Sequence, residues 1–199
     1  MRPAGADKTA SISVPTTSTT LAGDQVSPPV GAGVETQPTL PFTVQTPWAN
    51  GVAINALHTC NGGNVAPSIT WFGAPADAVE MALVVVDTDA NFVHWVISGL
   101  DPTNPEIPEG NVPVGAIEAT NDFGKVGWDG PCPPPGAPHH YEFTLYALDQ
   151  ATELPTGTPA KDLIAFIKNT QIDSAQVVGV YQAPVSSVST ASTVPTVSS

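Results

Sequence analysis

Five prolines stand within residues 131–138, directly after the glycines at 127 and 130. Because proline fixes φ and has no N–H group, this stretch cannot be helical and is predicted to form a stiff, exposed loop. Residues 139–148 follow at once and nearly alternate between apolar and polar types. They predict a strand with His139, Tyr141, Phe143 and Leu145 on one face. A rigid loop therefore delivers His139 and Tyr141 side by side.

A second segment also combines apolar strands with titratable side chains at their ends. Residues 81–86 are a continuous apolar run, which is typical of a strand buried on both faces, and the run ends at Asp87. After a tight turn, a second apolar strand opens at His94. We expect Asp87, His94, His139 and Tyr141 to meet at one end of a sheet.

The rest of the chain predicts one β domain between two flexible ends. Short apolar segments at 42–44, 51–54, 68–72 and 175–181 are separated by Gly/Pro turns, and residues 99–111 are expected to be a proline-punctuated loop. One helix is predicted at 160–168, with Thr158 as its cap and Pro159 at its first position. This pattern indicates an all-β, two-sheet antiparallel sandwich.

The predicted domain spans residues 39–183. Residues 1–38 are rich in Ser, Thr and Pro and show no apolar period, and residues 184–199 carry no charge. Neither segment contains enough apolar surface to offset its ordering entropy, so both are predicted to be disordered.

Charge and hydropathy exclude two classes of partner. Five Lys and Arg against 18 Asp and Glu give a formal net charge of -13, which repels nucleic-acid backbones. No apolar run is long enough to span a membrane, and no signal-peptide pattern occurs in this numbering. The acidity, the scarcity of lysine and the Ser/Thr/Pro-rich ends are nevertheless typical of exported bacterial proteins. Export to the periplasm or the medium is therefore predicted, with the cytoplasm as the alternative.

Two cysteines, Cys60 and Cys132, allow two interpretations. They are either unpaired buried thiols or a disulfide that closes about 70 residues and contributes about 4 kcal/mol through chain entropy. Export favours the disulfide. The chain lacks the four suitably spaced Cys or His ligands that a structural zinc site needs, so no metal is expected.

Several motifs occur together in a fixed order: D-T-D-A, H-W-V, P-E-G, N-D-F-G, G-P-C-P-P-P-G and H-x-Y-x-F-x-L-Y-A-L-D. In this order they resemble the phosphatidylethanolamine-binding protein (PEBP) family, specifically its bacterial and archaeal Raf-kinase-inhibitor-like branch, over about residues 41–183. The resemblance implies two packed antiparallel sheets of Greek-key type with one or two peripheral helices. It also allows a homodimer.

The resemblance further implies a small pocket for an anion of the phosphate or phospholipid-headgroup type. The positions carried over by the resemblance are Asp87, His94, Trp95, Gly130, Pro131, Pro133, His139, Tyr141 and Tyr181. Imidazole and phenol groups offer hydrogen-bond donors to an anion, and Asp87 is expected to orient a histidine or to receive an ammonium group. Anion affinity is expected to rise as the pH falls through the histidine range.

Two departures from the family pattern concern the rim of this pocket. Thr88 replaces the usual proline, and His140 stands where the family commonly has an arginine. In a strand, His140 faces away from His139 and Tyr141, so the ion pairing of that arginine is in doubt while the pocket side is intact.

Two other functions remain open at this stage. The family resemblance includes inhibitors that dock on kinases or serine proteases, and the stiff proline loop suits such docking. An enzyme that uses Asp87 and His94 is the third hypothesis, but there is no nucleophile elbow and no metal-binding motif. We therefore expect no catalysis and no cofactor.

Overall fold

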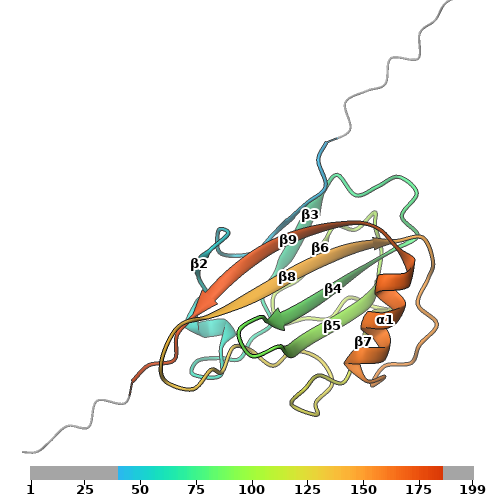
Figure 1. Cartoon of the computed structure of the whole chain (residues 1–199). Coiled ribbons are helices and arrows are strands. Elements are labelled where there is room, and N and C mark those ends of the chain that lie inside the picture. The colour runs from blue at the N-terminus through green and yellow to red at the C-terminus, as the bar shows by residue number, and fades with distance from the viewer. Residues whose placement is uncertain (1–39, 186–199) are drawn as a thin grey trace, which may run out of the picture. The chain divides into compact units, whose positions relative to one another are not determined.

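The computed structural model describes residues 40–185. They form two β-sheets packed face to face, with one α-helix on the outer face of the larger sheet (Figure 1). The predicted all-β sandwich is confirmed. The predictions of disorder at 1–38 and 184–199 concern segments outside the described residues, apart from residues 184 and 185.

The larger sheet has the strand order β2-β9-β8-β4-β5-β7. Its strands are β2 (Val52–Ala53), β4 (Glu80–Asp87), β5 (Phe92–Leu100), β7 (Ile117–Glu118), β8 (His139–Leu148) and β9 (Gln171–Tyr181). The chain leaves β5 and returns through residues 101–138 to place β8 beside β4, a connection of Greek-key type. As a result, the end of β4 and the starts of β5 and β8 lie together.

The apolar run of β4 is explained by its position between two layers. Leu83 and Val85 belong to the core between the sheets, whereas Ala82 and Val84 belong to a second core under the helix. Successive side chains of a strand point to opposite faces, so a strand buried on both faces needs apolar residues throughout.

The smaller sheet has the order β1-β3-β6, formed by β1 (Thr43–Gln45), β3 (Ile69–Phe72) and β6 (Glu106–Ile107). Its inward side chains include Trp71 and Ile107, which are 1% and 0% exposed. They pack against the larger sheet in the same core as Phe143. This core fixes the two sheets against each other and leaves the strand ends to form a site.

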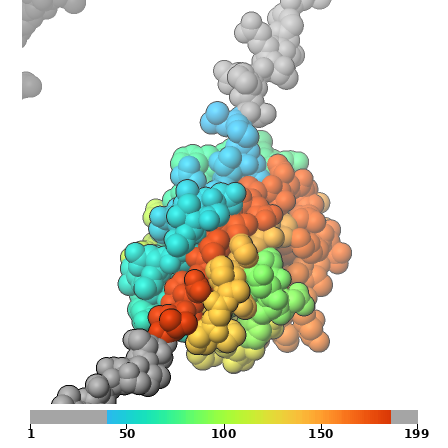
Figure 2. All heavy atoms as spheres, turned by 60° about the vertical axis from the view of Figure 1, so that its left-hand side comes forward, coloured from blue at the N-terminus to red at the C-terminus, as the bar shows by residue number. Residues whose placement is uncertain are grey.

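One strand pair departs from the antiparallel prediction. β2 runs parallel to β9, with hydrogen bonds of 2.8 Å from the N–H of Ile54 to the carbonyl of Val180 and from Gly51 to Val178. Figure 2 shows the early part of the chain, in cyan, lying along β9, in red. The early segment thereby covers the edge of β9 that would otherwise expose unpaired backbone groups.

The helix α1 (Ala160–Thr170) packs through Leu163 and Ile167 against the outer face of the large sheet. Thr158 does not cap it as predicted. Its hydroxyl donates to the carbonyl of Pro155 at 2.7 Å, and Pro159 occupies the capping position without a side-chain hydrogen bond. The first N–H of the helix instead donates to the carbonyl of Thr120 at 2.9 Å, so tertiary structure replaces the local cap.

Other strand assignments also differ from the prediction. β5 begins at Phe92 rather than at His94, and it continues to Leu100, into the segment predicted as a loop. The loop at 99–111 contains β6, which pairs with β3, and β7 was not predicted at all. β9 begins at Gln171, directly after the helix, rather than at residue 175. The prediction missed its first four residues because they are exposed and show no apolar pattern. No helix within residues 40–185 is long and apolar enough to cross a membrane.

Candidate functional site

Asp87 ends β4 and is 3% exposed. Its Oδ1 atom accepts hydrogen bonds from the backbone N–H groups of Asp89 at 3.0 Å and Ala90 at 3.1 Å. An Asp side chain that binds the backbone two residues on stabilises a tight turn. Asn91, with a φ of 50°, completes this turn before β5 begins. Asp87 therefore shapes the turn with one oxygen and keeps the other for a neighbour.

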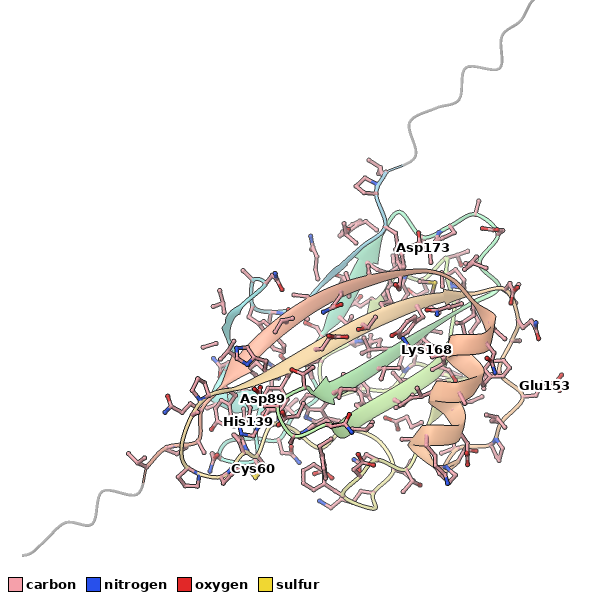
Figure 3. The ribbon with its side chains drawn as sticks, viewed as in Figure 1. Cys60, Asp89, His139, Glu153, Lys168 and Asp173 are labelled. Atoms are coloured by element: carbon pink, nitrogen blue, oxygen red, sulfur yellow. A yellow bond between two sulfur atoms is a disulfide. The ribbon has the colours of Figure 1, made fainter. Side chains whose placement is uncertain are left out.

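That neighbour is His139, the first residue of β8. β8 lies beside β4, with Tyr141 opposite Asp87, so the start of one strand meets the end of the other. Nδ1 of His139 lies 2.7 Å from Oδ2 of Asp87 and donates to it, because the carboxylate accepts. Figure 3 shows His139 with Asp89 and Cys60 at this end of the sheet.

His94 reaches the same place because of a β-bulge. In the β4·β5 ladder, Val85 pairs with Trp95 and Val86 pairs with Val93, so β5 carries one extra residue, His94, between these pairs. A bulge redirects the side chain of its extra residue, and bulges are common beside functional sites. Here the bulge turns His94 toward the end of the sandwich.

The His94 ring is 3% exposed and is enclosed by aromatic edges. The centroids of Tyr141, Phe92 and Phe123 lie 5.2, 5.4 and 5.3 Å from its own. Its Nδ1 donates to the backbone carbonyl of Asp129 at 2.7 Å. Burial lowers the pKa of His94, and this hydrogen bond and the nearby carboxylates offset the effect only in part.

The two histidines share a property that matters for binding. In each ring Nδ1 is used within the protein, whereas Nε2 has no hydrogen-bond partner among the described residues. Neither Nε2 atom is among the fully enclosed side-chain atoms without a partner in residues 40–185. Each Nε2 atom therefore keeps at least a small exposed surface.

The proline-rich loop is fixed on the other side of the site. Cys60 and Cys132 form the predicted disulfide, with their Cα atoms 5.4 Å apart. Beside it, the N–H of Cys60 donates to the carbonyl of Pro131 at 3.1 Å, and the N–H of Gly130 donates to Oδ1 of Asn64 at 2.7 Å. The loop is thereby attached to the segment that follows the short 3₁₀ helix η1 (Ala56–His58).

These elements enclose a cavity of about 140 Å³. It is lined by Asp87, Ala90, Phe92, His94, Phe123, Cys132, Pro133, Pro134 and His139. Drug-sized ligands need roughly 300–1,000 Å³, so the cavity suits a group of a few heavy atoms. Wider depressions exist elsewhere on the described surface, but one of about 580 Å³ includes a single titratable residue, Asp173, in its lining.

Of the nine predicted ligand residues, Asp87, His94, Pro133 and His139 line the cavity. Gly130 and Pro131 do not line it, and their backbone groups attach the loop to Asn64 and Cys60. Tyr181 instead donates its hydroxyl to Oδ1 of Asn61 at 3.0 Å.

Tyr141 lies directly behind His94 and is fully buried. Its hydroxyl lies close to Asp87 but makes no hydrogen bond of good geometry with any described residue. Burial first, and then the negative charge of Asp87 and its side-chain interaction with the hydroxyl, raise the pKa of Tyr141, so the hydroxyl keeps its proton. Because the hydroxyl is fully enclosed and Tyr141 does not line the cavity, Tyr141 supports His94 from behind and does not face a ligand.

Trp95 does not join the cavity, contrary to the prediction. It is 0% exposed, donates from Nε1 to Oε1 of Glu118 at 2.8 Å and meets Trp128 edge-on at 5.6 Å. Trp95 keeps its ladder position opposite Val85 in the core, and the bulge sends only His94 to the site. The H-W pair therefore divides into one site residue and one core residue.

The aromatic side chains of the wall, Phe92 and Phe123, were not predicted as site residues. Phe123 belongs to the N-D-F-G motif, and its position is set by Asn121, which is 4% exposed. Oδ1 of Asn121 accepts from the N–H groups of Phe123 at 3.0 Å and Lys125 at 3.1 Å, while its Nδ2 donates to the carbonyl of His94 at 3.3 Å. The N-D-F-G motif was the feature of the sequence that could have predicted this position of Phe123, because an Asn side chain at a tight turn hydrogen-bonds to its own backbone.

At His140, the position where the family commonly has an arginine, the structure shows hydrogen bonds to Asp89. Nδ1 of His140 lies 2.9 Å from Oδ2 of Asp89, and the backbone N–H of His140 lies 2.6 Å from the same oxygen. The backbone hydrogen bond from His140 is the main cause that lowers the pKa of Asp89. His140 thus connects the β4–β5 turn to β8 from the outer side.

Asp87, Asp89 and His139 offer ligand atoms within 4.8 Å of one another. Their closeness follows from the hydrogen bonds already described, in which Oδ2 of Asp87 binds His139 and Oδ2 of Asp89 binds His140. A metal would have to replace these bonds, so we assign no metal site to the cluster.

Comparison with known proteins supports one family. The family model described as phosphatidylethanolamine-binding protein matches residues 44–182, which include every residue of the cavity wall. LppC of Mycobacterium tuberculosis, named as a lipoprotein, is 40% identical over 147 residues, which cover 71% of this chain and 73% of LppC. A UPF0098 protein of Methanothermobacter thermautotrophicus is 35% identical over 137 residues, 65% of this chain and 90% of its own.

Two solved structures share the fold. Escherichia coli YbcL, described as a member of the mammalian PEBP family, superposes with a TM-score of 0.67 at 28% identity and covers 72% of this chain and 99% of its own. A PEBP homolog from Chlamydia trachomatis gives a TM-score of 0.65 at 25% identity, with 72% and 98% covered. By sequence and by fold, this chain belongs to the phosphatidylethanolamine-binding protein family.

Proposed function

We propose that this protein binds a small oxyanion of the phosphate type in the cavity between Asp87, His94 and His139. The observation that carries the proposal is the pair of imidazoles whose Nδ1 atoms are anchored and whose Nε2 atoms are accessible at the wall of a cavity of about 140 Å³. Anchoring both rings on one side presents the other side in a fixed orientation.

The chemistry of an imidazole Nε2 suits an oxyanion. A hydrogen bond between Nε2 and an ionised oxygen of the ligand is charge-assisted, and it is roughly twice as strong as a hydrogen bond between neutral groups. Asp87 does not touch the anion in this arrangement, because its oxygens are used by the turn and by His139. It holds His139 in place and fixes the orientation of its ring.

The size of the cavity limits the ligand. A phosphate group fits a site for a few heavy atoms, and a larger headgroup would have to extend toward solvent, where Pro134 is exposed and His139 is half-buried. The name of the family supports a phosphate-bearing ligand. Since Cys132 is in a disulfide and the described wall contains no hydroxyl side chain, we propose binding without turnover.

Isothermal titration of phosphate at pH 5.5 and pH 7.5 tests the proposal. We expect saturable binding that is tighter at pH 5.5, because a proton is then available between ligand and imidazole. His139→Ala is expected to weaken binding about tenfold or more, since a hydrogen bond to a charged group contributes about 1.5–3 kcal/mol.

His140→Ala is the matched control, because His140 neighbours His139 in the strand but faces Asp89 on the outer side. It should bind phosphate as the unchanged protein does. Equal losses in the two variants would show that the effect is structural. No heat from phosphate at either pH would end the anion proposal and would favour docking on a kinase or a protease.

We also propose that the protein is exported. The support is the Cys60–Cys132 disulfide, which persists in oxidising compartments, and the naming of the relative LppC as a lipoprotein. Alkylation of protein taken directly from cells is expected to label the two cysteines only after reduction. Labelling without reduction would place the protein in a reducing compartment.

A further inference from the structure

A second cavity, of about 310 Å³, is separate from the proposed anion site. Its wall includes Glu118 of β7, the buried Trp95, the half-buried Trp128 and two exposed valines, Val112 and Val126. None of the residues that line this cavity also lines the cavity of the proposed anion site. A ligand bound here would therefore be independent of the first one.

The carboxylate of Glu118 is half-buried and is anchored through one oxygen. Nε1 of Trp95 donates to Oε1 at 2.8 Å. The backbone of Gly127 packs against the same group, since a Cβ atom there would lie 2.9 Å from Oε1 and 3.2 Å from Oε2. Oε2 has no hydrogen-bond partner among residues 40–185, and it is not one of their fully enclosed unpaired atoms. The protein thus fixes the carboxylate and leaves one oxygen free at the cavity.

No basic side chain of the described residues neutralises this carboxylate. Glu118 takes part in none of their ion pairs, and Lys125, the lysine nearest to it in sequence, donates to Oδ1 of Asp129 at 3.1 Å. Residues 40–185 contain 15 Asp and Glu against three Lys, and such a field attracts cations. Burying a charge costs free energy unless a partner compensates it. A cation is therefore the partner that Glu118 lacks.

The rest of the wall suits a ligand with hydrogen-bond donors and an apolar arm. The side-chain amides of Asn64 and Asn111 already donate within the protein, to a carboxylate at 3.2 Å and to a backbone carbonyl at 2.9 Å. Nε1 of Trp128 is fully enclosed, so the surface that this side chain offers is carbon. Val112 and Val126, which are 47% and 50% exposed, add further apolar surface.

We propose that this cavity binds a primary ammonium group at the end of a short apolar arm. The ammonium donates to Oε2 of Glu118 beside Trp128, and the arm lies along Val112 and Val126. A hydrogen bond between ionised groups is roughly twice as strong as one between neutral groups, and an indole ring attracts a cation further. The volume is near the lower limit for drug-sized ligands, which suits an arm of a few carbons. Free alkylamines and lysine side chains share this chemistry.

Titration calorimetry of the full chain at pH 7.5 and low salt tests the proposal with n-butylammonium, n-butanol and a lysine whose α-amino and carboxyl groups are blocked. We expect saturable binding of n-butylammonium and at least about tenfold weaker binding of n-butanol, which has the arm without the charge. Blocked lysine that binds as tightly as n-butylammonium would support a lysine side chain of a partner as the ligand, whereas weaker binding would support a free amine. Absence of saturable binding by both amines, or equal binding of the alcohol, would overturn the proposal.

Glu118→Gln removes the charge but keeps an oxygen that can accept from Trp95. It should weaken n-butylammonium binding at least about tenfold and leave the urea midpoint of unfolding nearly unchanged. Glu109→Gln is the matched control, because it removes one charge beside Gly110 of the wall, although Glu109 is exposed and does not line the cavity. It should change the affinity by less than about twofold. Equal losses in both variants would mean that the acidic surface attracts the cation without a site.

The indole N–H signals of the four tryptophans locate the cation without any variant. In ¹⁵N-labelled protein, n-butylammonium should shift the signals of Trp95, whose N–H donates to Glu118, and of Trp128. The signals of Trp48 and Trp71 should stay in place, because neither residue lines the cavity. Saturable binding that moved none of the four signals, or all of them alike, would contradict a site at Glu118.

Discussion

The contact between Gly130 and η1 shows how closely the loop of the site is packed. A Cβ atom at Gly130 would lie 2.1 Å from the carbonyl oxygen of His58 and 2.9 Å from Oδ1 of Asn64. The N–H of Gly130 donates to the same oxygen of Asn64. No side chain fits here without moving backbone, so glycine is required by the approach of two chains and not by an unusual φ.

Gly130→Ala is therefore expected to lower the free energy of unfolding by about 1–3 kcal/mol, the usual cost of overpacking a filled interior. Urea unfolding followed by tryptophan fluorescence measures it. Gly136→Ala, in the same loop, is the control, because its Cβ would meet nothing closer than 4.0 Å and the residue is exposed. It should change stability by less than about 0.5 kcal/mol. Equal effects of the two substitutions would contradict the packing argument.

Among the elements, the sequence predicts β4 and β8 well, because each is long and carries a clear apolar pattern. The two-residue strands β6 and β7 have no such pattern, and their assignment depends on the strands beside them. The helix cap at Thr158 was predicted from local chemistry, but the carbonyl of Thr120, distant in sequence, satisfies the first N–H instead.

Prediction of the site from the sequence also fails for residues whose positions depend on pairing with distant strands. Asp87, His94 and His139 were predicted, since titratable side chains in a family-like order attract attention. The bulge that separates His94 from Trp95 was not, because an extra residue in β5 is defined only by its pairing with β4. The aromatic wall of Phe92 and Phe123 was missed for a related reason: apolar side chains near a strand end are usually assigned to the core.

At the scale of the whole molecule, the charge opposes the ligand that the site is proposed to bind. Residues 40–185 contain 15 Asp and Glu against three Lys, and the nearest carboxylates lie within the site itself. Such a field lowers the local concentration of anions and slows their arrival. Binding then depends on short-range hydrogen bonds, which salt screens much less than long-range repulsion.

Phosphate affinity at pH 6.0 is consequently expected to stay constant or to rise as potassium chloride increases from 10 to 150 mM. Over this range the screening length falls from about 30 Å to about 8 Å, so the repulsion from distant carboxylates fades. Titration calorimetry measures the affinity at each salt concentration. An affinity that falls steeply with salt would contradict this account and would reveal a local positive field.

Removing distant charges tests the same field directly, without a change of salt. Glu153 and Asp173 are exposed and lie far from His139 (Figure 3). The double variant Glu153→Gln, Asp173→Asn should bind phosphate more tightly than the unchanged protein at 10 mM salt, by less than about twofold, since distant charges separated by water interact by only roughly a few tenths of a kcal/mol. At 150 mM the two proteins should bind equally. A difference that persisted at high salt would mean that these residues act on the site through the fold rather than through the field.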